Sequence, residues 1–258
     1  MKIAQLTDLH LGRKNEDTYG VNTRSNFLRC LDDIRAYQPD LLVITGDICF
    51  REGDEKVYAW LKKQLQDLSF PLRFIPGNHD HTPTMTRALE IPFPLREGQL
   101  YYQEEFPQKN IHLFYTDSSS YRLSANQTLW LEQQLSKSPH RHLLLFIHHP
   151  PAKYTRNGYM DAKHALQNQE EVMAAIRRAT GDSDRRLHIF CGHYHAEKLI
   201  LLPAANVFIT PSTFLQIDLQ KENFAIDHYT PAWRKIEISP SHIATEVRYL
   251  FNHQTQIQ

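Results

Sequence analysis

Residues 1–10, MKIAQLTDLH, place a short apolar run, residues 3–7, directly before Asp8-Leu9-His10. Similar apolar runs occupy residues 41–45, 72–75, 143–147 and 187–190. Each run is followed by polar side chains that can bind metals, where an ordinary strand would be followed by turn residues. The early runs alternate with helical patterns, which is typical of a parallel or mixed sheet with helices packed outside it. The sequence therefore predicts an α/β fold with its chemistry at the ends of the strands.

Three segments repeat apolar residues at the spacing of a helix. The first should end at Gln38-Pro39, because proline disfavours a helical conformation in the residue before it. The third and weakest should end at Gly181-Asp182. An apolar helix face normally packs on a sheet. We therefore expect core positions at Phe27, Leu28, Leu31 and Ile34, at Tyr58, Leu61, Leu65 and Leu68, and at Val172, Ile176 and Ala179.

After Pro211 the chain changes to β-like runs, at residues 214–217, 224–229, 235–238 and 243–250. No clear linker precedes them, so we expect an antiparallel continuation of the same domain. A chain of 258 residues with 41% hydrophobic residues can bury the core of one α/β domain. The prediction is a single domain over residues 1–258, with a metal-site core at about 1–212 and a β-rich continuation at about 213–258 that frays at its polar end.

The composition argues against several classes of partner and location. Lys+Arg and Asp+Glu number 29 each and form no long run of like charge, so neither a nucleic-acid partner nor a membrane-surface partner is expected. The three cysteines lie far apart and form neither a disulfide framework nor a CxxC-type zinc motif. No stretch resembles a signal peptide or approaches the ~20 apolar residues of a membrane span. We expect a soluble cytoplasmic protein, whose oligomeric state the sequence leaves open.

Five short motifs carry the candidate chemistry, each behind an apolar run. In open α/β sheets ligands lie beyond the carboxyl ends of the strands, so motifs that are distant in sequence converge there. Each motif alone is more typical of a turn, a cap or a surface histidine pair, but the whole set indicates one site. Its carboxylate, amide and imidazole groups suit Mn, Fe, Zn or Co rather than a sulfur-loving metal. The motifs are Asp8-Leu9-His10, Gly46-Asp47, Gly77-Asn78-His79-Asp80, His148-His149-Pro150 and Gly192-His193-Tyr194-His195.

This ordered set resembles the calcineurin-like metallophosphoesterase superfamily, whose pattern is D-x-H, G-D, G-N-H-[D/E], H and G-H-x-H, with no part missing. The resemblance covers Asp8 to His195 and implies a four-layer α/β/β/α sandwich with two divalent metal ions at one edge of the paired sheets. It also implies that Asp47 bridges the ions, a position that suits a carboxylate because its charge offsets the repulsion between two cations. The other metal ligands that it implies are Asp8, His10 and His195 for one ion, and Asn78, His148 and His193 for the second.

Within the superfamily the chain is more closely similar to bacterial 3′,5′-cyclic-nucleotide phosphodiesterases of the cyclic AMP type. That similarity implies hydrolysis of 3′,5′-cyclic AMP to 5′-AMP by a hydroxide formed from a metal-bridging water. Glycerophosphodiesterases share several of the motifs, so a broader phosphodiesterase acting on glycerophosphodiesters or other nucleotides is an alternative. A non-catalytic scaffold is another, although this chain keeps every ligand. The motifs are Gly20-Val21-Asn22-Thr23, His148-His149-Pro150-Pro151, Cys191-Gly192-His193, Thr210-Pro211-Ser212-Thr213 and Pro231-Ala232-Trp233-Arg234.

Residues beside the ligands have expected roles toward the substrate. His79 is free to contact the phosphate or the departing oxygen, with Asp80 orienting its ring; the alternative is a packed histidine that bonds to backbone. Asn78 is expected to contact the substrate as well as a metal. His149 is expected either in the pocket or behind the ligands. Tyr194 either flanks the substrate or closes the core.

Three outer features have simpler expected roles. The charged segment from Gly12 to Asn22 is expected to form a rim loop, because loops at strand ends commonly form pockets. Cys191 is expected to be a small buried hydrophobe rather than a ligand. Trp233 is expected in the core rather than as a platform for a base. The sequence therefore leaves the residues that recognise a nucleoside unidentified.

Overall fold

The computed structural model describes residues 1–155, 157–181 and 186–251, so the polar end at 252–258 lies outside the described residues. Its first sheet has the strand order β13-β12-β1-β2-β3. The first three strands along the chain pair in parallel, and the two C-terminal strands extend the sheet in antiparallel fashion from β1. These strands are β1 (Lys2–Leu6), β2 (Leu41–Thr45), β3 (Leu72–Ile75), β12 (Ala232–Ile238) and β13 (Ile243–Tyr249).

The second sheet has the order β4-β5-β6-β7-β9-β8. Its four central strands are parallel, and the two edge strands are antiparallel to their neighbours. The strands are β4 (Tyr102–Phe106), β5 (Ile111–Tyr115), β6 (His142–Phe146), β7 (Leu187–Cys191), β8 (Lys198–Leu201) and β9 (Ala205–Ile209). A separate short hairpin joins β10 (Gln216–Ile217) to β11 (Ile226–His228).

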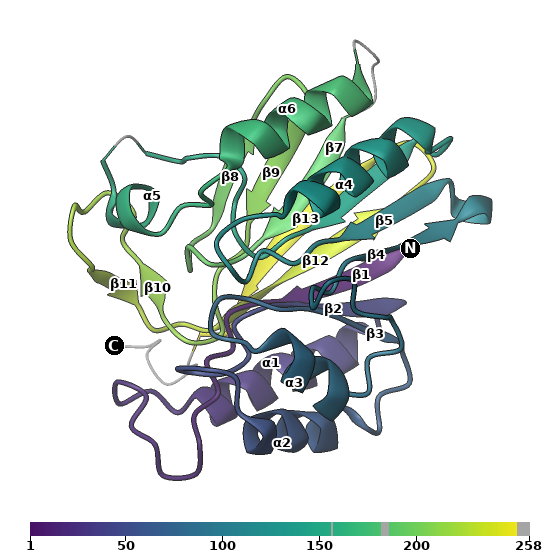
Figure 1. Cartoon of the computed structure of the whole chain (residues 1–258). Helices are drawn as coiled ribbons and strands as arrows, with labels where there is room; N and C mark the ends of the chain where they lie inside the picture. The colour runs from purple at the N-terminus through teal and green to yellow at the C-terminus, as the bar shows by residue number, and fades with distance from the viewer. Residues whose placement is uncertain (156, 182–185, 252–258) are drawn as a thin grey trace, which may run out of the picture.

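Helices cover the outer face of each sheet (Figure 1). The first sheet is covered by α1 (Thr23–Tyr37), α2 (Glu55–Leu65) and α3 (Thr82–Ala88), and the second by α4 (Ala125–Lys137) and α6 (Gln169–Thr180). The short elements are α5 (Tyr159–Lys163) and the 3-10 turn η1 (Pro107–Lys109). The predicted α/β class and four-layer α/β/β/α arrangement are therefore confirmed. No helix in the described part of the chain is both long and apolar enough to cross a membrane.

The core between the sheets explains why the predicted strands are apolar without alternation. Every residue of β2 and of β6 is buried, because each strand has one face against the opposite sheet and one face under helices. Leu144, Phe146 and Phe190 of the second sheet pack in the same cluster as Ile3 and Ile44 of the first. The two sheets are thus held together by apolar side chains, and their strand ends reach one common edge.

The predicted helical stripes are confirmed as core. In α1 the side chains of Phe27, Leu31 and Ile34 are buried. The Asn22 side chain caps the helix by accepting a hydrogen bond from the Ser25 N–H at 3.0 Å. Gln38 ends α1 in the left-handed conformation, with φ 50°. The chain then enters β2 through Pro39, at the predicted stop.

The antiparallel edge strands β4 and β8 were not predicted from the sequence. The β4 segment, YQEEF, lacks a continuous apolar run because it lies at the edge of the sheet with part of its surface exposed. In β8, exposed Leu199 and Leu201 alternate with partly buried Lys198 and Ile200. These strands are held by pairing with β5 and β9, and such pairing is not visible in local sequence.

Candidate active site

The expected ligands converge on one cleft at the carboxyl ends of the strands. Asp8 and His10 follow β1, Asp47 follows β2 and Asn78 follows β3. His148 follows β6 in the second sheet, and the residues after β7 complete the set. The cleft has a volume of about 570 Å³, and the expected ligands in its lining are His10, Asp47, Asn78, His193 and His195. Both sheets therefore contribute side chains to one site, as strand ends that share an edge allow.

The two carboxylates lie between histidines of both expected ligand sets. Asp47 Oδ2 is 3.3 Å from His148 Nε2 and 3.7 Å from His10 Nε2. Asp8 Oδ1 is 3.2 Å from His195 Nε2 and 3.9 Å from His148 Nε2. All of these residues are almost fully buried. A carboxylate with histidine nitrogens on two sides is in position to contact two cations at once.

Backbone carbonyls hold three of the histidine rings in a form that can bind metal. His148 Nδ1–H donates to the Thr45 carbonyl at 2.8 Å, and His193 Nε2–H donates to the His164 carbonyl at 2.8 Å. His195 Nδ1–H donates to the Leu215 carbonyl at 2.9 Å. Because a carbonyl oxygen only accepts, each ring nitrogen facing a carbonyl carries the proton, and in the neutral ring the second nitrogen keeps its lone pair.

Asn78 supplies a further sign that the site holds cations. Its Oδ1 is buried and has no hydrogen-bond partner within the described residues. An unpaired buried acceptor is costly, and a divalent cation would satisfy it. Groups of histidine and aspartate lie close enough to hold a metal, among them Asp8, His10 and His195, and also Asp8, Asp47 and His148. The donor set of oxygen and nitrogen atoms fits the metals expected from the sequence.

Burial and neighbouring charges set the protonation of the rings. Burial, together with the nearby His195, lowers the pKa of His10 to about 3. Burial, together with His148, lowers the pKa of His193 to about 3. Burial also acts to lower the pKa of His148, but the Asp47 and Asp8 carboxylates and the hydrogen bonds of the ring together outweigh it and raise that pKa to about 9. His10 and His193 are thus neutral, as metal ligands must be, whereas a metal at His148 would displace a proton.

The backbone at the site is unusual. Asp8, His10, Asp47, His193 and His195 all have left-handed φ angles, between 43° and 65°. This conformation is uncommon for residues other than glycine and costs energy, so it persists where the surrounding structure enforces it. Four of these five residues, His10, Asp47, His193 and His195, line the cleft. The clustering of such residues at one edge indicates a functional site.

His79 and Asp80 lie near the carboxylates but do not interact with each other as expected. The His79 ring donates from Nδ1 to the Arg51 carbonyl at 2.8 Å, so this carbonyl, and not Asp80, orients the ring. The Asp80 carboxylate accepts instead from the N–H groups of Gly77 and Ile48 and from the Tyr58 hydroxyl. Asp80 therefore joins the loop after β3 to the loop after β2. One ring nitrogen of His79 lies within 4.8 Å of ligand atoms of His10 and Asp47. Metal binding is therefore a second role open to His79.

Two expected substrate contacts are buried behind the cleft. Tyr194 is fully buried, and its hydroxyl donates to Asp161 Oδ1 at 2.6 Å, so this ring closes the core and does not flank a substrate. His149 is also fully buried, with Nδ1 at 2.9 Å from Ser118 Oγ. Its ring packs on His193 with the ring centroids 4.0 Å apart. Of the two expected positions for His149, the structure shows the one behind the ligands.

A family comparison agrees with this geometry. The family model described as calcineurin-like phosphoesterase matches residues 1–197, which include all five motifs. The chain belongs to the calcineurin-like phosphoesterase family. Members of this family are hydrolases of phosphate esters, so the cleft at the strand ends is the candidate active site of a phosphoesterase.

Similar proteins are found over nearly the whole chain. A probable cyclic nucleotide phosphodiesterase of Fibrobacter succinogenes is 32% identical, with 96% of this chain and 94% of the relative aligned. The 3′,5′-cyclic adenosine monophosphate phosphodiesterase CpdA of Escherichia coli K12 is 29% identical, over 99% of this chain and 92% of the relative. A probable glycerophosphodiester phosphodiesterase, GpdQ, of Arcobacter nitrofigilis is 34% identical, over 86% and 82%.

Solved structures show the same phosphoesterase fold at low identity. A dimetal phosphatase from Danio rerio matches with a TM-score of 0.65 at 13% identity, over 95% of this chain and 98% of the phosphatase. At this identity the match supports the fold alone. This match and the family model both agree with a fold of two sheets whose strand ends share one edge.

The phosphoesterase cleft also has an aromatic lining that was not predicted. Tyr19, Phe50 and Phe214 line the side near His10, and Tyr121 and Tyr159 line the side near His193. Tyr19 comes from the segment expected to form a rim loop. The other aromatic residues belong to segments without a motif, so only the fold brings them to the site.

Cys191 and Trp233 have the positions expected of them. Cys191 is fully buried and Trp233 is 1% exposed. Trp233 Nε1–H donates to Asp33 on α1 at 2.9 Å, so the indole lies between the first sheet and a helix. Neither residue lines the cleft. Both residues are therefore buried in the core, as predicted.

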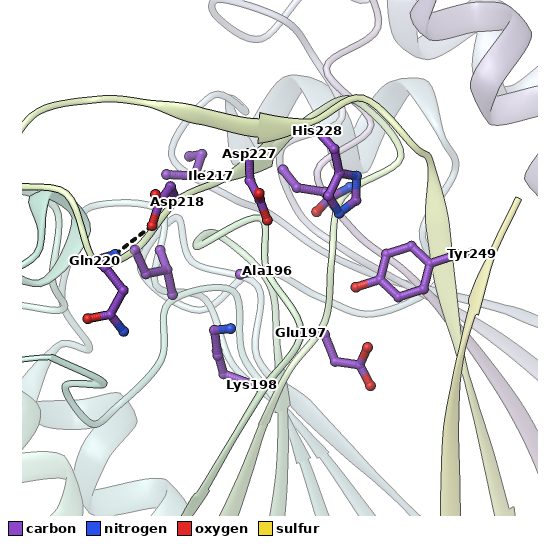
Figure 2. A pocket seen from close by; sticks show the side chains of 11 residues that line it. Ala196, Glu197, Lys198, Ile217, Asp218, Gln220, Asp227, His228 and Tyr249 are labelled. Carbon is purple, nitrogen blue, oxygen red and sulfur yellow. Dashed lines mark hydrogen bonds between the residues drawn. The ribbon is translucent and has the colours of Figure 1, made fainter. Parts of the chain in front are cut away.

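A second cavity, of about 270 Å³, lies beside the β10–β11 hairpin and is shown in Figure 2. Glu197, Asp218, Asp227, His228 and Tyr249 are among its lining residues. None of the residues expected to bind metal or substrate lines it. The phosphoesterase chemistry therefore belongs to the larger cleft.

Gly192 permits the close approach of two ligand loops, and we expect its replacement by alanine to disturb the metal site. A Cβ atom at this position would overlap Thr7 Oγ1 and Asp8 Oδ2. Overpacking of this kind costs about 1–3 kcal/mol and would displace the Asp8 carboxylate. Gly192→Ala should lower both the free energy of unfolding in urea and the bound metal. Ser136→Ala is the control, because Ser136 is exposed on α4 and does not line the cleft. Normal metal content in Gly192→Ala would contradict the prediction.

Proposed function

We propose that this chain is a dinuclear metal-dependent phosphodiesterase that hydrolyses 3′,5′-cyclic AMP to 5′-AMP. The observation that carries the proposal is the buried cluster of aspartates and histidines, in which Asp8 and Asp47 each lie within 4.0 Å of at least two histidine nitrogens. Support for the substrate comes from relatives named as cyclic nucleotide phosphodiesterases, which align over more than nine tenths of this chain.

The proposed ligands form two sets that share Asp47. In this proposal one ion is held by Asp8, His10 and His195, and the second by Asn78, His148 and His193. When bound, two divalent ions would polarise the phosphoryl group and make a water molecule acidic enough to act as a nucleophile near neutral pH. The chain itself supplies the buried carboxylates that balance their charge.

His79 is the proposed proton donor to the leaving oxygen. Its Nδ1–H is held by the Arg51 carbonyl, so Nε2 is the nitrogen that remains for the substrate. As a general acid, the ring would donate its Nε2–H to the 3′ oxygen as the P–O bond breaks. Half-buried at the rim of the cleft, His79 is accessible to a bound diester.

A glycerophosphodiesterase is the second candidate, because the relative that bears this name is 34% identical over 86% of the chain. Either substrate is a small phosphodiester, and the same cleft would bind it.

The three cysteines are free and buried, which supports the proposed cytoplasmic location.

The product of cyclic AMP cleavage tests the proposal. We expect metal-loaded protein to release 5′-AMP only, because the 3′ oxygen is the proposed leaving group. Chromatography of the reaction mixture separates 5′-AMP from 3′-AMP. The same preparation should be offered glycerophosphocholine, and kcat/KM for the two substrates should be compared. A dominant 3′-AMP product, or turnover of glycerophosphocholine alone, would refute the cyclic AMP assignment.

A further inference from the structure

Three aromatic side chains form a recess beside the metal site, which we call the aromatic recess: Tyr19, Phe50 and Phe214. The rings of Tyr19 and Phe214 are nearly parallel, with an interplanar angle of 20° and centroids 6.2 Å apart. The Phe50 ring stands perpendicular to both, at 79° to Tyr19 and 82° to Phe214. The three centroids lie 5.5 to 6.2 Å apart, so the rings pack on one another and form one aromatic wall of the cleft.

We propose that the aromatic recess binds the nucleobase of the substrate, stacked on the exposed ring of Tyr19. This inference rests on the proposed cyclic nucleotide phosphodiesterase function. The Phe214 ring centroid is 5.2 Å from that of His10, so the recess adjoins the metal ligands. A phosphate near His10 and a base in the recess would therefore belong to one small nucleotide.

Exposure favours Tyr19 as the platform for a base. The Tyr19 side chain is 66% exposed, whereas Phe50 and Phe214 are buried. A planar base can therefore stack on the exposed Tyr19 ring without separating the three rings.

The loop that carries Tyr19 is anchored although the ring is exposed. Glu16 pairs with Arg51 at 3.0 Å, and Arg13 pairs with Asp54 at 2.6 Å. Tyr19 itself has a left-handed φ of 54°, which is costly for an aromatic residue. These contacts connect the loop to the segment after β2 and hold the exposed ring opposite Phe214. A ligand would find one wall of its binding site already in place.

Charge favours a neutral base over a cation in the recess. Three aromatic rings can also bind a quaternary ammonium group through cation–π attraction. Here the Arg51 guanidinium already lies 5.4 Å from the Phe50 ring centroid. Arg51 is paired with Glu16 and already occupies the cation–π position on Phe50, so a second cation would have to displace it, whereas a neutral purine would not. We therefore assign the recess to a base and not to choline.

The test compares cyclic AMP with a base-free analogue. In this analogue the same ribose 3′,5′-cyclic phosphate carries a hydrogen atom where the base would be. Stacking on an aromatic side chain typically changes affinity by about 5- to 150-fold. Tyr19→Ala should lower kcat/KM for cyclic AMP by that factor, mainly through KM. The loss on the base-free substrate should be much smaller. Tyr19→Trp should restore most of the cyclic AMP activity, because a larger ring still stacks.

Tyr229→Ala provides a matched control, because Tyr229 is 53% exposed and does not line the cleft. Equal losses on both cyclic phosphates in Tyr19→Ala, or no loss on either, would overturn the inference and leave the proposed function intact. A selective loss on glycerophosphocholine would overturn it in favour of an ammonium site. If wild-type protein cleaves neither cyclic phosphate, the proposed function itself is wrong, and the inference falls with it.

Discussion

Replacing Asp47 by asparagine should remove most of the bound metal and lower kcat/KM by about 10³-fold or more, because metal ions supply several kcal/mol of transition-state stabilisation. Asp47 Oδ1 accepts from the His79 N–H at 2.8 Å, and Oδ2 faces His148 Nε2 at 3.3 Å. In the amide, the oxygen would keep the bond to His79 and the NH₂ group would face His148. That NH₂ would then donate to the lone pair proposed to bind metal, and the negative charge between the proposed ions would be lost.

The Asp47 experiment needs metal analysis and kinetics on the same preparation. Asp33→Asn is a suitable control, because Asp33 on α1 bonds Trp233 and Arg248 and contacts no proposed ligand. This variant should keep its metal and its turnover. If Asp47→Asn retains two metals per chain with near-normal activity, Asp47 does not bridge the ions.

His79→Ala should slow cyclic AMP hydrolysis by about 10²- to 10⁴-fold, the usual contribution of a general acid. A ribose 3′ alkoxide is strongly basic and needs a proton as the P–O bond breaks. p-Nitrophenolate leaves without such help, so cleavage of bis-p-nitrophenyl phosphate should suffer much less. The ratio of the two losses in kcat/KM, at verified metal content, is the decisive measurement.

His81→Ala is the matched control for His79, because His81 is exposed and bonds Thr84 Oγ1 at 2.7 Å instead of facing the cleft. It should affect both substrates little. Equal losses on both substrates in His79→Ala would exclude a role in protonating the leaving group and would point to phosphate binding. Loss of metal in that variant would instead make His79 a ligand, an option that its distance from His10 and Asp47 allows.

Local sequence was sufficient to predict a residue's role where that role depends on the residue type and on its position in or directly after a strand. Fully buried runs such as LLVIT, at residues 41–45, predict strands because both faces need apolar side chains. The polar residues after these strands could be expected together, because parallel strands end at one edge. Tyr194 shows the limit, since its neighbours His193 and His195 line the cleft while its own side chain points into the core.

By itself, the sequence determined the α/β class, five of the parallel strands and the chemistry of the candidate ligands, since these depend on residue type and short-range spacing. Only the tertiary structure decided that the Arg51 carbonyl orients His79, and that Asp80 joins two loops. It also decided which aromatic rings face the cleft, because Tyr19 and Phe214 are 195 positions apart and meet only through the packing of the two sheets. Contacts of this range depend on the path of the whole chain, which no local pattern records.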